Sequence, residues 1–151
     1  MNRKSGFTLV ETVVMIAVLG VLAIVAIQIV PNLSRSRLDV AAKQVTSDIE
    51  LARQMAQTKG QTSGVKFVSG GSYTAYLGTT ATPIKSPLTK ADMVILLSSN
   101  YPGVSISSNY VVEFNRFGQP TTGGGGSVTL TDGTSTKTVT ITANTGKVTQ
   151  Q

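Results

Sequence analysis

The stretch KSGFTLVE, residues 4–11, decides how this chain folds and where it goes. A basic leader ends in Gly6-Phe7, and a single carboxylate, Glu11, then precedes 23 uncharged residues, 12–34. A secretory signal peptide carries its cleavage site after the apolar core, behind small residues. Here the strong junction lies before the apolar run, so we expect that run to survive maturation as a membrane helix.

The apolar run has the length of one membrane crossing. Residues 12–30 comprise 19 residues, which at about 1.5 Å per residue give a helix roughly 28 Å long, close to the hydrocarbon thickness of a bilayer. Arg3 and Lys4 precede the run, and the positive-inside rule keeps them in the cytoplasm. We therefore expect a single-pass protein with its N-terminus inside and the rest of the chain exported.

The stretch around Gly6-Phe7-Thr8-Leu9-Val10-Glu11 resembles the class III signal of type IV pilins and type II secretion pseudopilins. The resemblance implies that a prepilin peptidase cleaves between Gly6 and Phe7, that Phe7 is N-methylated, and that the subunit assembles from the inner membrane into a helical filament. It also implies that Glu11 pairs with the N-terminal ammonium of a neighbouring subunit. An unpaired carboxylate in hydrocarbon is costly, which agrees with that role; a carboxylate left in the headgroup layer is the alternative.

Beyond Pro31 the pattern becomes amphipathic. Apolar residues recur at spacings of four and three: Leu38, Ala42, Val45, Ile49, Ala52 and Ala56. The charged residues fall largely between them: Arg37, Asp39, Lys43, Asp48, Glu50 and Arg53. This pattern predicts a helix with one face on a globular head and the other in solvent, ending near Gly60. Because Pro31 lacks a backbone donor, we expect a kink or a loosened turn at residues 27–30.

After residue 62 the chain breaks into short β-type runs separated by Gly, Pro, Asn and Ser. We expect strands at residues 65–68, 73–77, 93–97, 104–107 and 110–114. Residues 128–131 and 138–142 alternate apolar and polar side chains around Asp132-Gly133, which predicts a hairpin with one buried face, followed by a last strand at 147–149. The run of glycines at 123–126 leads into a strand without a following helix or Lys, so it predicts an inter-strand loop instead of a phosphate site.

Two further segments are similar to the GspH/FimT group of minor pseudopilins and minor pilins. They are the helical segment 37–59, and the tail with Phe114-Asn115-Arg116-Phe117-Gly118 and Thr145-Gly146-Lys147-Val148. The resemblance implies a pilin-like α+β fold, in which a long N-terminal helix packs on a small antiparallel β-sheet head. The expected divisions are a cleaved leader (1–6), a transmembrane or filament-core helix (7–30), an amphipathic helix half (31–60) and a β-rich head (61–151).

The composition argues against catalysis. The chain has no His and no Cys, and the carboxylates of the head are reduced to Asp92, Glu113 and Asp132, so no acid/base pair or activated nucleophile is indicated. Asp132 stands apart from other hard ligands, which argues against a calcium site near the C-terminus. We expect no enzyme, no metal and no cofactor.

Basic charge raises a nucleic-acid alternative, because the chain carries 13 basic against 7 acidic residues. The densest local group, Arg35, Arg37 and Lys43, is explained by a solvated helix face or by headgroup contact. Some members of the similar group bind DNA through a Gly-Arg-x-Arg tail. Here Gly146 matches, Lys147 replaces the first Arg, and Thr149 stands at the second. Lys147 is therefore a weak candidate DNA contact.

The resemblance thus implies a structural subunit, a minor pilin or pseudopilin of a type IV pilus or type II secretion pseudopilus, placed near the filament tip. Its expected partners are other pilins or pseudopilins, the prepilin peptidase and an inner-membrane assembly platform. A major pilin of the shaft and a DNA-binding minor pilin of a competence pilus stay open as alternatives.

Overall fold

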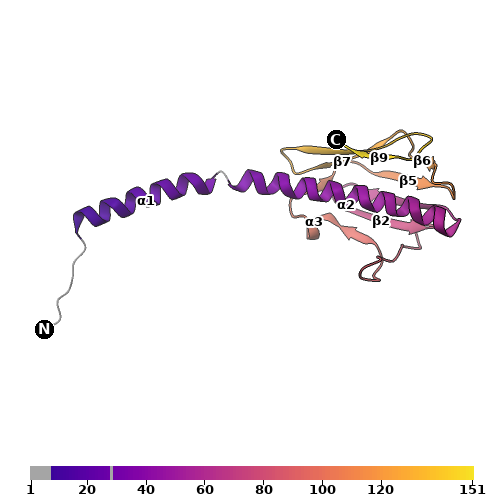
Figure 1. The fold of residues 1–151 in the computed structure, drawn as a ribbon, viewed down its shortest axis with the longest axis horizontal. Coiled ribbons are helices and arrows are strands. Elements are labelled where there is room, and N and C mark those ends of the chain that lie inside the picture. Colours follow the sequence, from indigo (N-terminus) through magenta and orange to yellow (C-terminus); the bar gives the residue numbers. More distant parts are fainter. Residues whose placement is uncertain (1–7, 28) are drawn as a thin grey trace. The chain divides into compact units, whose positions relative to one another are not determined.

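The computed structural model describes residues 8–27 and 29–151 and divides the chain into two compact units, the first ending at Ser34 and the second running from Arg35 to Gln151. Figure 1 shows the ribbon. Gly6 and Phe7 lie outside the described residues. The expected division at residues 6, 30 and 60 stays a prediction.

The first unit contains helix α1, Leu9–Ile27, and the start of helix α2, Ile29–Lys59. Within residues 8–27 and 29–151, no helix has both the length and the apolar character needed to cross a membrane. Pro31 is the third residue of α2, a position where a missing N–H removes no intrahelical hydrogen bond. The predicted kink includes residue 28, outside the described part of the chain, and stays a prediction.

In the second unit α2 buries one face against the sheets. All six apolar residues of the predicted stripe are buried, together with Ala41. Gly60 follows the helix with a φ of 64°, the left-handed conformation in which glycine ends helices. One prediction for this helix was wrong: Asp48 was expected on the solvent face but is only 4% exposed. Its carboxylate is accommodated because Tyr73 and Gln44 donate hydrogen bonds to it.

The first sheet has five antiparallel strands in the order β3-β2-β1-β5-β6. Their bounds are β1 Ser63–Val68, β2 Ser72–Leu77, β3 Val94–Leu96, β5 Tyr110–Phe114 and β6 Pro120–Thr122. Strand β1 lies at the centre, where it pairs with β2 on one side and β5 on the other. The side chains of Val65, Phe67, Ala75 and Val112 project from this sheet into the core.

The second sheet has four antiparallel strands in the order β4-β7-β8-β9. Their bounds are β4 Ser105–Ile106, β7 Ser127–Thr131, β8 Thr136–Ile141 and β9 Val148–Gln150. Strands β7 and β8 form the predicted hairpin around Asp132-Gly133, with Val128, Leu130, Val139 and Ile141 buried on one face. In Figure 1, α2 crosses in front of the strands, with β7 and β9 above it and β2 below.

Each predicted strand overlaps a strand of the structure, but two elements were missed. Helix α3, Leu97–Asn100, replaces the end of the strand expected at 93–97. Strand β6 begins at Pro120. Proline cannot donate a hydrogen bond to a β-ladder, so the sequence did not indicate a strand there. The structure places β6 at the sheet edge, where that missing donor costs little. The glycine run at 123–126 joins β6 to β7 as a loop.

Candidate functional site

Thr8 caps the N-terminus of α1. The backbone N–H of Glu11 donates to Thr8 Oγ1 at 3.3 Å, and the N–H of Thr12 donates to the Thr8 carbonyl at 3.2 Å. Thr8-Leu9-Val10-Glu11 has the spacing of a capping box, a helix-start signal that the sequence analysis did not use. The residue that follows Phe7 therefore fixes where the helix begins.

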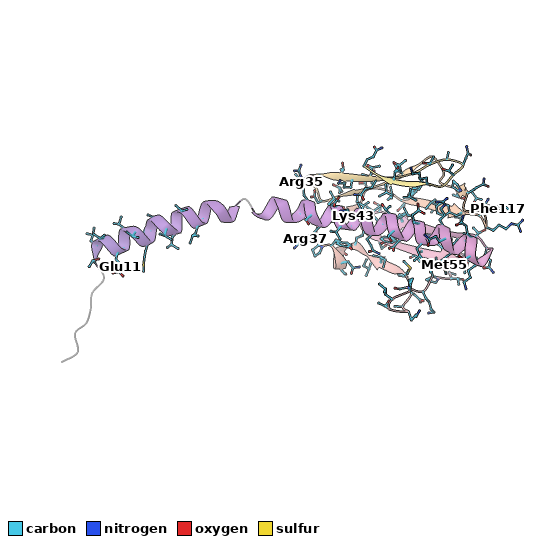
Figure 2. All side chains as sticks on the ribbon, viewed as in Figure 1. Glu11, Arg35, Arg37, Lys43, Met55 and Phe117 are labelled. Atoms are coloured by element: carbon cyan, nitrogen blue, oxygen red, sulfur yellow. The ribbon has the colours of Figure 1, made fainter. Side chains whose placement is uncertain are left out.

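Glu11 lies exposed in the first turn of α1, the positive end of the helix dipole. Figure 2 shows it on the described part of α1. Ten large apolar side chains between Leu9 and Leu22 surround the same helix, and each is 52–81% exposed. A helix that is apolar on all sides needs apolar partners around its whole circumference. Glu11 is the charged group that such partners would meet.

Segments 114–118 and 145–148 meet on the last turns of α2. Arg53 Nε donates to the Gly118 carbonyl at 3.0 Å, and Gln57 Nε2 donates to the Phe117 carbonyl at 3.2 Å. The backbone N–H of Val148 donates to Glu50 Oε1 at 3.4 Å. The motifs quoted for the second resemblance thus serve to attach α2 to both sheets.

Two glycines make this junction possible. A Cβ on Gly146 would lie 2.8 Å from the Gly118 carbonyl oxygen and 3.0 Å from the Phe114 ring. Gly118 itself has a φ of 77°, and a Cβ there would lie 2.5 Å from Gln57 Nε2. The Gly146 match therefore has a packing explanation.

Within residues 8–27 and 29–151, the basic side chains do not all gather into one interface. Figure 2 shows Arg35, Arg37 and Lys43 toward one end of the second unit and Phe117 at the other, where the Arg116 guanidinium lies 4.9 Å from the centre of the Phe117 ring. Lys43 Nζ lies 2.7 Å from Asp39 Oδ2, a contact that holds the pKa of Asp39 below its ordinary value. Lys147 is exposed at the junction. One cation beside a packing glycine does not favour a nucleic-acid function.

Asp48 carries the unusual electrostatics of the second unit. Tyr73 Oη donates to its Oδ2 at 2.6 Å, and Gln44 Nε2 donates to its Oδ1 at 2.9 Å. Burial raises the pKa of Asp48, and the two hydrogen bonds oppose that rise. Burial, and then the Asp48 charge and hydrogen bond, raise the pKa of Tyr73. The pair joins α2 to β2 inside the core.

Comparisons with known proteins cover both units. A family profile described as type II transport protein GspH matches residues 41–146, and a profile of the prokaryotic N-terminal methylation motif matches residues 1–27. No curated protein matches the chain. The fold is similar to the crystal structure of the type IV minor pilin FimU of Pseudomonas aeruginosa, with 14% identity and a TM-score of 0.53 over 76% of this chain and 92% of that one.

Proposed function

The chain belongs to the family of type II transport protein GspH, and from this membership we propose that it is a minor pilin or pseudopilin, processed at Gly6-Phe7, held in the inner membrane and then assembled into a filament near its tip. Pilins and pseudopilins are structural subunits, so the chain is not an enzyme. The predicted α+β pilin fold and the resemblance to the GspH group are confirmed.

One observation carries the proposal: a helix begins directly after the processing motif, and its large apolar side chains are exposed on all sides behind a single carboxylate. Full burial of one such side chain contributes about 1.5–3 kcal/mol. Ten of them between Leu9 and Leu22 therefore provide a strong drive for α1 to lie among other apolar helices or acyl chains. That requirement suits a subunit that waits in a membrane and then joins a filament core.

Glu11 provides the specificity that apolar packing lacks. In the proposed filament its carboxylate accepts hydrogen bonds from the Phe7 ammonium of the neighbouring subunit. Apolar contacts are non-directional, so several axial positions of one helix against the next would have similar energies. An ion pair at one position fixes the register of the helices, because a carboxylate left unpaired there is costly.

The membrane stage rests on the sequence of the N-terminal segment. Residues 12–34 are uncharged, and the cations Arg3 and Lys4 precede them. We propose that the segment crosses the inner membrane once with its N-terminus in the cytoplasm, where a prepilin peptidase reaches Gly6, and that an inner-membrane platform then lifts the subunit into the filament with other pilins.

Replacement of Gly6 by Asp tests this proposal. The Gly6→Asp variant should keep residues 1–6 and be absent from filaments, because the processing motif is lost. The matched Ser5→Ala variant should be cleaved normally, since it changes the adjacent residue without touching the junction. The readout is the N-terminal peptide of the membrane-fraction protein by mass spectrometry. A Gly6→Asp protein that begins at Phe7 would contradict the assigned cleavage site.

A further inference from the structure

A groove of about 630 Å³ lies between α2 and the segment that runs from β2 to β3. One wall is formed by Gln44, Asp48 and Leu51, which follow one another at helical spacings of four and three. The other wall is formed by Leu88 and Asp92 of the connection between β2 and β3 and by Ile95 of β3. All of these residues belong to the second unit.

The groove is acidic. Its lining includes the carboxylates of Asp48, Glu50 and Asp92, and among the described residues that line it none is Lys or Arg. Glu50 and Asp92 have cations beside them, Arg53 at 3.4 Å and Lys85 at 3.0 Å.

Asp48 differs from the other two carboxylates. In the described part of the chain no Lys or Arg nitrogen lies within 4 Å of it, and its hydrogen-bond partners, Tyr73 and Gln44, are both neutral. A carboxylate that is 4% exposed and lacks a counter-ion is costly to keep charged. A cation that entered the groove would offset this cost.

The groove also offers apolar contact. Leu51 and Ile95 are half-buried in its walls, and Leu88 at its mouth is 93% exposed. Lys and Arg side chains have long aliphatic stems that pack on apolar surface while the charged head stays with polar groups. The combination of apolar walls and a buried carboxylate matches that chemistry.

We propose that this groove binds a segment of a neighbouring, different pilin subunit that presents a Lys or Arg beside an apolar residue, with the cation directed at Asp48 and the apolar residue at Leu88. The inference rests on the proposed function, since it takes its partner from the filament. A minor subunit is surrounded by subunits other than itself, so the occupant is a different chain. Charge complementarity would then select which pilin sits beside this one.

Photo-crosslinking from Leu88 tests the proposal in the full-length, processed protein. A photoreactive p-benzoylphenylalanine replaces Leu88, whose exposure allows the change without disturbing the core, and the matched control carries it at Thr134, in the exposed turn of the β7–β8 hairpin. In sheared filaments, the Leu88 probe should crosslink to a peptide of another pilin that contains Lys or Arg. The Thr134 probe should not reach that peptide.

An Asp48→Asn change separates binding from folding. Asparagine keeps the size of the side chain but removes the charge. Its oxygen can accept the hydrogen bond from Tyr73, and its nitrogen can donate to Gln44 once the exposed Gln44 amide turns over. The crosslink from Leu88 should fall at least threefold while the melting temperature of the protein is not lowered. An unchanged crosslink yield would overturn the proposal.

The remaining outcomes distinguish this inference from the function on which it rests. If the subunit is present in filaments but the Leu88 probe gives no crosslink, reaches a second copy of the chain, or reaches a peptide without Lys or Arg, the groove proposal is wrong and the proposed function stands. If the processed subunit is absent from both filaments and pseudopili, both are wrong.

Discussion

The two helices carry the same kinds of apolar residue but differ in whether those residues are buried. Val45 of α2 is fully buried under the sheets of its own chain, whereas Val13 of α1 is 57% exposed. The face of α2 is thus matched to strands that this sequence itself provides. The apolar surface of the described part of α1 is not covered by other residues of its own unit. What α1 packs against in the cell therefore depends on its surroundings.

This difference is visible in the arrangement of the side chains. In α2 the apolar residues form one stripe, and the polar residues between them make ion pairs such as Lys43 with Asp39. In α1 the exposed apolar residues lie on all sides, and Glu11 carries the charge of the first turn. A change in α2 should therefore alter folding, and a change in α1 should alter assembly.

Glu11→Val should give the largest effect and should leave folding intact. We expect cleavage and membrane insertion as in the wild type but at least about a tenfold loss of incorporation into filaments, because loss of one partner of a desolvated charge pair costs about 2–5 kcal/mol. The measurement is the ratio of subunit in sheared filaments to subunit in membranes, with the melting temperature of the second unit as the control. Normal incorporation would contradict the claim that Glu11 of α1 serves assembly.

Ile49→Ala should lower the free energy of unfolding by about 2–5 kcal/mol, since Ile49 is fully buried between α2 and the sheets and its truncation leaves a cavity. Val40→Ala on the same helix is the matched control, because Val40 is 47% exposed, and it should change stability by no more than about 0.5 kcal/mol. Thermal or denaturant unfolding of the two variants checks this. Equal effects would contradict the assigned packing face.

Gly118→Ala should destabilise the protein more than Gly133→Ala does. Both glycines have positive φ, 77° and 87°, so both variants lose about 1–2 kcal/mol to backbone strain. A Cβ at 118 also meets Gln57, whereas nothing lies within 4 Å of one at 133. Displacement of Gln57 removes its hydrogen bond to Phe117, which adds about 1 kcal/mol. Matched unfolding curves measure the difference. Equal stabilities of the two variants would show that the contact between Gly118 and Gln57 does not contribute to stability.

Asp48→Asn should have the smallest effect on stability and a distinctive pH dependence. Because burial raises the pKa of Asp48 above its ordinary value of 3.8, the folded wild type holds this proton more tightly than the unfolded chain. Its contribution to stability is complete below that value and is lost as the pH rises through the folded pKa.

The asparagine variant does not titrate at this position. Its stability relative to the wild type should therefore rise from acidic to neutral pH. It should end within about 1 kcal/mol of the wild type, because the asparagine oxygen still accepts from Tyr73 and the exposed Gln44 amide can turn to accept from the asparagine nitrogen. Melting temperatures of both proteins across the pH range provide the test. A variant that is strongly destabilised at neutral pH would show that the Asp48 charge supports the fold.

Local patterns predicted the elements that depend on neighbours in sequence. The stripe from Leu38 to Ala56, the helix end at Gly60 and the β7–β8 hairpin all follow from spacing and turn residues, and the structure confirms them. The fold class and the family resemblance were likewise accessible.

The features that the sequence analysis missed depend on contacts between distant residues. Asp48 is buried because Tyr73, 25 positions later, supplies a hydrogen bond. The junction of Arg53 with Gly118 joins residues 65 positions apart. No local pattern contains either pairing. The Thr8 cap is the exception, since its Thr-x-x-Glu spacing is a local pattern that indicates a helix start, and it was missed all the same.

The most direct test of the account is quantitative mass spectrometry of sheared surface filaments beside the membrane fraction, which reads both the copy number of the subunit and its N-terminal peptide. We predict that the subunit is present in the filaments in trace amounts and that its first residue is methylated Phe7. Abundance equal to the shaft subunit would make it a major pilin, and absence from filaments would indicate a periplasmic pseudopilus. A protein that still begins at Met1 in both fractions would contradict the central claim that α1 is released by processing to join other subunits.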